Sequence, residues 1–110
     1  MLNLNDFAKE VHELAKEKGW WESTRNFPEQ IALMHSELSE VLEDYRNNKP
    51  IKELSFGNTN KPTGIPIEFA DLVIRVLDTC AAYEIDIDTA IALKHNYNKT
   101  RPYKHGNKLC

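Results

Sequence analysis

Two helix-periodic apolar segments, residues 31–46 and 65–83, constrain the fold of this chain more than any other feature. Each segment carries two acidic residues three positions apart, namely Glu37 with Glu40 and Glu68 with Asp71. Residues at this spacing share one face of a helix, so each pair projects together. A helical hairpin would bring both pairs into one cluster, where each close pair of carboxylates costs about 3 to 4 kcal/mol in repulsion. The pattern therefore predicts a cation site.

The remaining periodic segments predict an all-α chain. We expect four helices, at about residues 4–18, 26–47 and 66–83, and between a cap at Asp86 or Asp88 and Pro102. Gly19 is the expected stop of the first helix. The chain is expected to form one domain, residues 1–110, with a four-helix bundle-like core.

Two segments fall outside the expected helices. Residues 48–64 carry two glycines and two prolines among polar residues, which predicts a long loop with a short turn at residues 51–54. Residues 101–110 form a basic, glycine-containing tail. A loop this long in a small domain is often functional.

The overall charge excludes some partners. The chain has a net charge of −3 and a pI of about 5.8, so it lacks the general basic field that attracts nucleic acids. It has no apolar stretch of membrane-spanning length and no secretory-signal pattern at its start. Cys80 in an apolar stripe and Cys110 at the end form no disulfide framework. We expect a cytoplasmic protein that binds neither nucleic acid nor membrane.

The cation expected at the paired acids is a hard one. Mg²⁺, or Mn²⁺ as a second possibility, prefers oxygen ligands and shares its shell with water and phosphate. A di-iron bundle is disfavoured, because no histidine follows a glutamate by three positions. The alternative without metal is a pair of solvated acidic faces. Against it, the third helix is apolar around most of its circumference, with one narrow polar stripe formed by Glu68, Asp71, Arg75 and Asp78.

Polar residues near the C-terminus have the character of a phosphate site. Three of them are spaced four and then three apart and share one helix face: Lys94, Asn98 and Arg101. Two cations with an amide between them suit a di- or triphosphate. The alternative is a solvated basic turn that complements the helix dipole. Phosphate contact would extend into the tail through Tyr103, Lys104 and His105.

Two adjacent tryptophans, Trp20 and Trp21, follow the first helix. A tryptophan here would stack on a nucleobase, which is worth roughly 1 to 3 kcal/mol, or would plug the end of the bundle. With two side by side, one residue is available for each role. His35 points away from the Glu37 pair on the helical wheel and is expected at the core edge or an interface.

These motifs resemble those of the MazG-like, all-α nucleoside triphosphate pyrophosphohydrolases, which are related to the dimeric dUTPases. The family signature is an ExxE pair, a gap of variable length and an ExxD pair. This chain has Glu37 and Glu40, then 27 intervening residues, then Glu68 and Asp71. The flanking segments, residues 35–46, 65–78 and 94–108, are also similar to the family, so the resemblance covers most of the chain.

The resemblance implies a specific reaction, hydrolysis of a nucleoside triphosphate between its α and β phosphates. It implies that all four acids hold Mg²⁺, that Glu37 and Glu40 are catalytic, and that Glu40 orients or deprotonates the attacking water. Family members are dimers or tetramers, with substrate sites completed near subunit contacts. The resemblance therefore also implies a homodimer or homotetramer, and base preference stays open.

Two hypotheses follow from the sequence. The leading one is a Mg²⁺-dependent nucleotide pyrophosphohydrolase that acts in nucleotide pool sanitation. The alternative is a non-catalytic helical module that oligomerises or senses a nucleotide. The joint presence of paired acids and a basic face favours the enzyme, because a plain scaffold needs neither.

Overall fold

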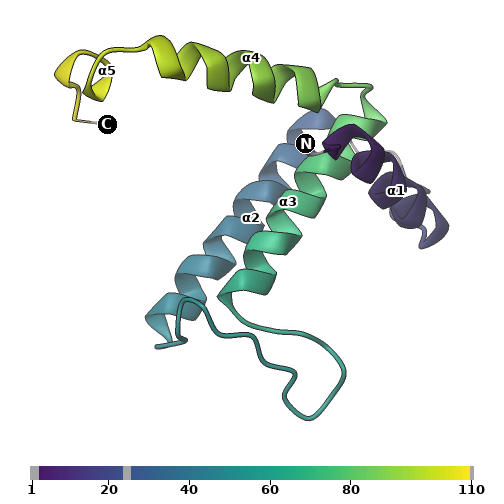
Figure 1. The fold of residues 1–110 in the computed structure, drawn as a ribbon. Helices are drawn as coiled ribbons and strands as arrows, with labels where there is room; N and C mark the ends of the chain where they lie inside the picture. The colour runs from purple at the N-terminus through teal and green to yellow at the C-terminus, as the bar shows by residue number, and fades with distance from the viewer. Residues whose placement is uncertain (1–2, 24–25, 110) are drawn as a thin grey trace.

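The computed structural model describes residues 3–23 and 26–109, with Cys110 outside this range. It contains four long helices, α1 (Leu4–Glu17), α2 (Phe27–Arg46), α3 (Ile65–Ala82) and α4 (Ile87–Thr100), and a short helix α5 (Lys104–Asn107) (Figure 1). The described residues hold no strand beyond one isolated bridge, so the all-α expectation is confirmed. None of the described helices combines the length and the apolar character that crossing a membrane would require.

The helix boundaries follow from local capping. The side chains of Asn3, Asn26 and Asp86 each accept a hydrogen bond from a backbone N–H in the first turn of α1, α2 and α4. At the end of α1, the Trp20 N–H donates to a carbonyl five residues back and the Gly19 N–H to one three residues back. This is the Schellman pattern, and Gly19 has the positive φ that it needs. The cap directs the chain after α1 into the Trp20 and Trp21 turn.

The central helix is α3, which packs against α1 on one side and α2 on the other. Its side chains Ile65, Leu77 and Cys80 are buried, as is Ala8 of α1. The apolar girth of α3 explains its central place, because a helix that is apolar on most sides needs two neighbours. The face of α3 between these two contacts carries the polar stripe.

Reciprocal capping joins α4 to α1. The Asp88 carboxylate accepts hydrogen bonds from the backbone N–H groups of Leu4 and Asn5 at 2.9 and 3.0 Å. In return, the Asn5 side-chain oxygen accepts from the N–H groups of Ile87 and Asp88 at 3.0 and 3.3 Å. The backbone N–H groups at the start of each helix thus gain acceptors that the helix itself does not supply. From this joint α4 and α5 lead away from α2 and α3 (Figure 1).

The position of α4 differs from the expected four-helix core. None of its residues is buried, and its substantial packing is against α1. The cause lies in its sequence, since the face that begins with Ile87 and Ile91 continues with Lys94 and Asn98. The apolar stripe therefore stops after about two turns and offers too little surface to hold α4 against the other helices. One chain on its own forms a three-helix core with a projecting fourth helix.

The single chain is expanded and leaves apolar side chains uncovered. Its radius of gyration is 16.8 Å, against about 13 Å for a compact domain of this length. Leu38 and Leu42 of α2 and Phe69 and Val73 of α3 are among many large apolar residues that stay exposed. Exposed apolar side chains are a common feature of interaction surfaces.

Backbone contacts hold the long loop between α2 and α3 in place near the start of α3. Ser55 and Thr63 form an antiparallel bridge through two backbone hydrogen bonds of 3.0 and 2.6 Å. Gly64 follows with φ +120°, and a Cβ there would collide with the Glu53 carbonyl. Only glycine fits this position without strain. The loop therefore enters α3 at a fixed angle, one turn before Glu68.

Candidate functional site

Three of the predicted metal-binding acids converge between α2 and α3. Glu37, Glu40 and Glu68 each offer one carboxylate oxygen, and these oxygens lie within 4.8 Å of one another. Ligand oxygens around an octahedral Mg²⁺ lie about 3 to 4.2 Å apart, given metal–oxygen bonds of about 2.1 Å. A small contraction of the three side chains would therefore suffice to hold one ion. The helical hairpin has brought the ExxE acids to the first acid of the ExxD pair.

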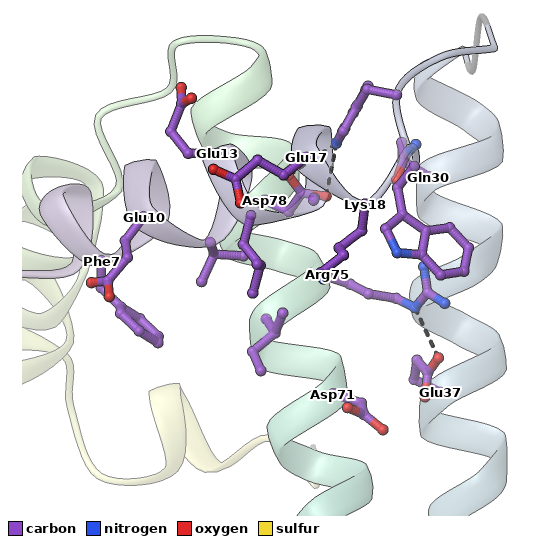
Figure 2. A pocket seen from close by; sticks show the side chains of 16 residues that line it. Phe7, Glu10, Glu13, Glu17, Lys18, Gln30, Glu37, Asp71, Arg75 and Asp78 are labelled. Atoms are coloured by element: carbon purple, nitrogen blue, oxygen red, sulfur yellow. Dashed lines mark hydrogen bonds and ion pairs between the residues drawn. The ribbon is translucent and has the colours of Figure 1, made fainter.

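Asp71, the fourth predicted ligand, lies beside this cluster, outside the group of three. Figure 2 shows its carboxylate on α3 near that of Glu37 on α2. Burial raises its pKa, and the charges of Glu37 and Glu40 raise it further, while Arg75 and Lys61 oppose them. Asp71 thus belongs to the same electrostatic site and would join the ion's shell by a rotamer change or through water.

The cluster is strained electrostatically without a cation. The pKa of Glu68 is raised to about 7, first by burial, then by a hydrogen bond with Glu40 and by the charges of Glu40, Asp44 and Asp71. The ordinary pKa of a glutamate is 4.5. At neutral pH the site therefore retains a proton on a large share of molecules, and a divalent cation would displace it.

Arg75 supplies the positive charge nearest to the cluster. Its Nε donates to Glu37 Oε1 at 2.8 Å, the ion pair drawn as a dashed line in Figure 2. The two side chains are 31% and 14% exposed, so solvent screens this pair less than an ordinary surface pair. An ion bound at Glu37 would compete with Arg75, which would free the guanidinium to face a phosphate group.

The long loop adds two lysines to the surroundings of the acids. At its start, Lys49 Nζ lies 3.4 Å from Asp44 Oδ1, while Asp44 Oδ2 is buried without a hydrogen-bond partner. Near its end, the charge of Lys61 lowers the pKa of Asp71. The loop therefore places two positive charges at the edge of an acidic site, where they would attract an anionic ligand.

A cavity of about 910 Å³ opens beside the acids, between α1, α2 and α3. Figure 2 shows Glu37 and Asp71 at one end of it, Arg75 in the middle and Gln30 toward the other end. Its size matches that of cavities which enclose small-molecule ligands. A ligand in this cavity would have a polar end at the acids and a second end among the aromatic residues of the α1 turn.

Both predicted tryptophans line this cavity. The indole Nε1 of Trp21 donates to both carboxylate oxygens of Asp78 on α3, at 3.1 Å each. His12 Nδ1 lies 2.7 Å from the same carboxylate, and its ring meets the Trp21 ring edge to face at 5.2 Å between centroids. Trp21 is thus fixed in orientation, whereas Trp20 is 55% exposed. The arrangement gives Trp21 the rigidity of a stacking platform.

The predicted phosphate-binding residues of α4 and the tail lie apart from the acids in the single chain. The Lys94 ammonium and the Arg101 guanidinium lie over the Tyr97 ring, at 5.2 and 5.7 Å from its centroid. Asn98 shares their helix face. In the tail, the Lys104 ammonium lies 5.7 Å from the Tyr103 ring centroid. Because α4 leads away from α2 and α3, these residues lie apart from the acidic cluster of their own chain (Figure 1).

Four residues at or behind the cavity wall were assigned no role from the sequence: His12, Gln30, Arg75 and Asp78. A signal existed for two of them, since Arg75 and Asp78 continue the polar stripe of an otherwise apolar helix. Gln30 precedes Glu37 by seven residues, which places both on one helix face. His12 follows the buried Ala8 by four, which indicated only an inward direction.

Comparison of the chain with models of protein families, with curated proteins and with solved structures gave no match.

Proposed function

We propose that this protein is a Mg²⁺-dependent nucleotide pyrophosphohydrolase that converts a nucleoside or deoxynucleoside triphosphate into its monophosphate and pyrophosphate, in nucleotide pool sanitation. One observation carries the proposal. Three carboxylates from two helices lie within reach of a single ion, and they border a cavity that also holds two tryptophans. Metal ligands at one end and aromatic rings at the other match the two ends of a nucleotide.

The acids fit the expected ion by their chemistry. All four side chains offer hard oxygen donors, and the raised pKa of Glu68 indicates a need for positive charge there. Bound Mg²⁺ would offset the charge of the polyphosphate and acidify a water molecule. Glu37, Glu68 and Asp71 would hold the ion, and Glu40, the exposed member of the cluster, would also orient or deprotonate the attacking water.

The protein's further task is to place the phosphates and the base. Arg75 lies on α3 between Asp71, at the acids, and Asp78, which binds the Trp21 indole. Once released from Glu37, its guanidinium would stabilise charge on a phosphate. Trp21 would stack on the base, since Asp78 fixes its ring orientation. A triphosphate would thus span the cavity from the acids to the α1 turn.

We further propose that the protein is a homo-oligomer in which a partner completes the site. On α2 and α3 lies a largely apolar groove of about 530 Å³, lined by residues that include His35, Leu42 and Phe69. A second copy would bury this surface. It would also bring a basic α4, with Lys94, Asn98 and Arg101, toward acids that its own chain does not reach. Tyr103 and Lys104 would follow on the same segment.

A pyrophosphate-release assay tests the proposal. The eight common ribo- and deoxyribonucleoside triphosphates are supplied with Mg²⁺ or Mn²⁺, and the products are separated to distinguish pyrophosphate from phosphate. Monophosphate and pyrophosphate in equal amounts would support the reaction. Release of phosphate alone, or no turnover of any of the eight with either metal, would reject it.

One observation favours the alternative, a non-catalytic interaction or nucleotide-sensing module. The exposed apolar side chains of α2 and α3 are what an assembly scaffold would present. A sensor would bind nucleotides without turning them over. Calorimetric titration with a triphosphate, followed by recovery of the nucleotide, separates the two: intact triphosphate after saturation binding indicates a sensor.

A further inference from the structure

The side-chain amide nitrogen of Gln30 is a buried donor without a hydrogen-bond partner. Gln30 lies in the first turns of α2, is 4% exposed, and its Nε2 is buried without an acceptor. Leaving such a donor unpaired is unfavourable, because the group has given up its hydrogen bonds to water without gaining others. Leucine or methionine would fill the same space at no such cost. Packing alone therefore does not explain a glutamine at this position.

The position of the Gln30 side chain indicates that it contacts a ligand in the cavity. Gln30 borders the 910 Å³ cavity together with Trp20 and Trp21, away from the acids at the other end (Figure 2). On the same wall, Asp78 already binds the indole N–H of Trp21 and the ring of His12. Asp78, Trp21 and His12 thus already have polar partners in one another, whereas the Gln30 amide nitrogen has none and could donate to a ligand.

We propose that Gln30 is the specificity-determining residue for the nucleobase, an inference that rests on the proposed nucleotide site. Its Nε2 donates to a carbonyl oxygen or ring nitrogen on the edge of a base that stacks on Trp21. The terminal amide torsion of glutamine is soft, so a small rotation turns the donor from the wall into the cavity. Glutamine pairs with a base edge through its donor and its acceptor together. The substrate class is a nucleotide whose base presents an acceptor beside a donor.

The unpaired amide explains why binding depends on the base. A site with a buried group that needs a partner discriminates strongly against ligands that lack one. A base that accepts a hydrogen bond from Nε2 gains binding free energy from it, whereas inorganic triphosphate has no base to make this contact. Gln30→Leu removes both the cost and the recognition. It is therefore expected to stabilise the free protein and to weaken base binding.

The chain offers a matched control. Thr79 on α3 is 3% exposed, and its Oγ1 is also buried without a partner, but Thr79 does not line the cavity. Thr79→Val removes an unpaired polar group of the same kind elsewhere. Both variants should raise the melting temperature, and only Gln30→Leu should affect nucleotides. Gln30→Glu, which keeps the shape but loses the donor when ionised, should weaken binding as Gln30→Leu does.

The experiment measures binding without hydrolysis. Nucleoside monophosphates are titrated calorimetrically into the full chain and its variants, with Mg²⁺ and inorganic triphosphate as the base-free probe. Gln30 is the only glutamine in the chain, so glutamine-selective ¹⁵N labelling gives one side-chain amide signal, which should shift on addition of monophosphate. We expect Gln30→Leu to weaken binding of at least one monophosphate about tenfold to a hundredfold. Binding of inorganic triphosphate should be unchanged.

Three results would overturn the inference: an unmoved amide signal at saturation, unchanged monophosphate affinity in Gln30→Leu, or equal losses for monophosphate and inorganic triphosphate. Failure of the hydrolase proposal is distinguishable from these. If the protein binds monophosphates through Gln30 but releases no pyrophosphate, the role of Gln30 stands and the hydrolase proposal fails. If Gln30→Leu hydrolyses every triphosphate as well as the wild type does, the hydrolase proposal stands and the role of Gln30 fails.

Discussion

The indole nitrogen of Trp21 lies 3.1 Å from each carboxylate oxygen of Asp78, so a residue of the turn after α1 is held by the C-terminal part of α3. His12 contributes a third contact to the same carboxylate at 2.7 Å. Hydrogen bonds to a charged acceptor are stronger than neutral ones. The contact therefore closes one wall of the cavity and sets the plane of the Trp21 ring.

Replacing Asp78 should loosen this wall. We expect Asp78→Ala to lower the free energy of unfolding by about 1 to 3 kcal/mol and to raise KM for the nucleotide with a smaller effect on kcat, because Trp21 loses its orientation. Tryptophan fluorescence should shift to longer wavelength as the indole gains solvent contact. Asp78→Asn retains an acceptor for the indole and should restore part of the affinity. If KM and the emission spectrum stay unchanged in Asp78→Ala, the wall does not depend on Asp78.

The paired acids should be essential for turnover but not for folding. Glu40→Gln and Asp71→Asn keep the shape of each side chain and remove its charge, so helicity by circular dichroism should be unchanged. We expect kcat to fall about a hundredfold or more, since each loss disturbs the ion that activates water. The control is Glu43→Gln, an exposed acid of α2 outside the group of three. Full activity in either site variant would remove that residue from the mechanism.

The raised pKa of Glu68 predicts how stability depends on pH without metal. The pKa of Glu68 is about 7 in the folded protein, against an ordinary glutamate value of 4.5. The folded state thus binds the proton more tightly, and the free energy of unfolding falls as pH rises from about 4.5 to about 7. Allowing for solvent screening, Glu68 should contribute about 1 to 2 kcal/mol to this fall.

Urea unfolding in EDTA at a series of pH values measures the effect. Glu68→Gln cannot ionise, so its curve should lack this part of the slope and the variant should be the more stable protein at pH 7.5. Two carboxyls with lowered pKa, Glu13 and Asp86, act in the opposite direction in both proteins and cancel in the difference. Identical slopes for Glu68→Gln and the wild type would show that this carboxyl titrates normally.

Magnesium should stabilise the protein by relieving the repulsion among the acids. An ion at 100 times its Kd contributes about 2.7 kcal/mol, which for a chain of this size raises Tm by of the order of 10 °C. Calorimetric scans with Mg²⁺ are compared with scans in NaCl of equal ionic strength, which removes general screening. Glu37→Gln should lose most of the gain. Equal Tm values in the two salts would speak against a metal site.

Parts of this architecture were predictable because they depend on local pattern. The helices and their caps at Asn26 and Asp86 follow from spacing and from side chains that compete for backbone donors. The meeting of Glu37, Glu40 and Glu68 follows from helix periodicity once the two helices form a hairpin. Seven-residue spacing places Gln30, Glu37 and Asp44 on the same inward face of α2.

Other parts depend on contacts between distant residues, which periodicity does not encode. The Arg75 ion pair and the Asp78 contacts join side chains that lie 38 to 66 residues apart. The direction of α4 is set by the Asn5 and Asp88 caps, 83 residues apart. A helical wheel shows which side of a helix is polar, and it does not show which neighbour meets that side.

The final prediction concerns the division of the site between two copies of the chain. The double variant Lys94→Ala/Arg101→Ala should lose activity through its phosphate contacts, and Glu40→Gln should lose it through the metal and water. If acids and basic residues of one site come from different subunits, a mixture allowed to exchange subunits forms mixed dimers with one intact site each. An equimolar mixture should then recover about a quarter of wild-type activity.

The mixing experiment has an internal control, because Glu40→Gln mixed with Asp71→Asn carries both lesions on the acidic side. Those mixed dimers contain no intact site if all four acids of a site belong to one chain, so that mixture should stay inactive. Sedimentation measurements show whether subunits associate at all, as the exposed apolar faces of α2 and α3 lead us to expect. Recovery in neither mixture, despite demonstrated exchange, would mean that α4 serves its own chain's acids after a rearrangement, or does not contact the phosphates.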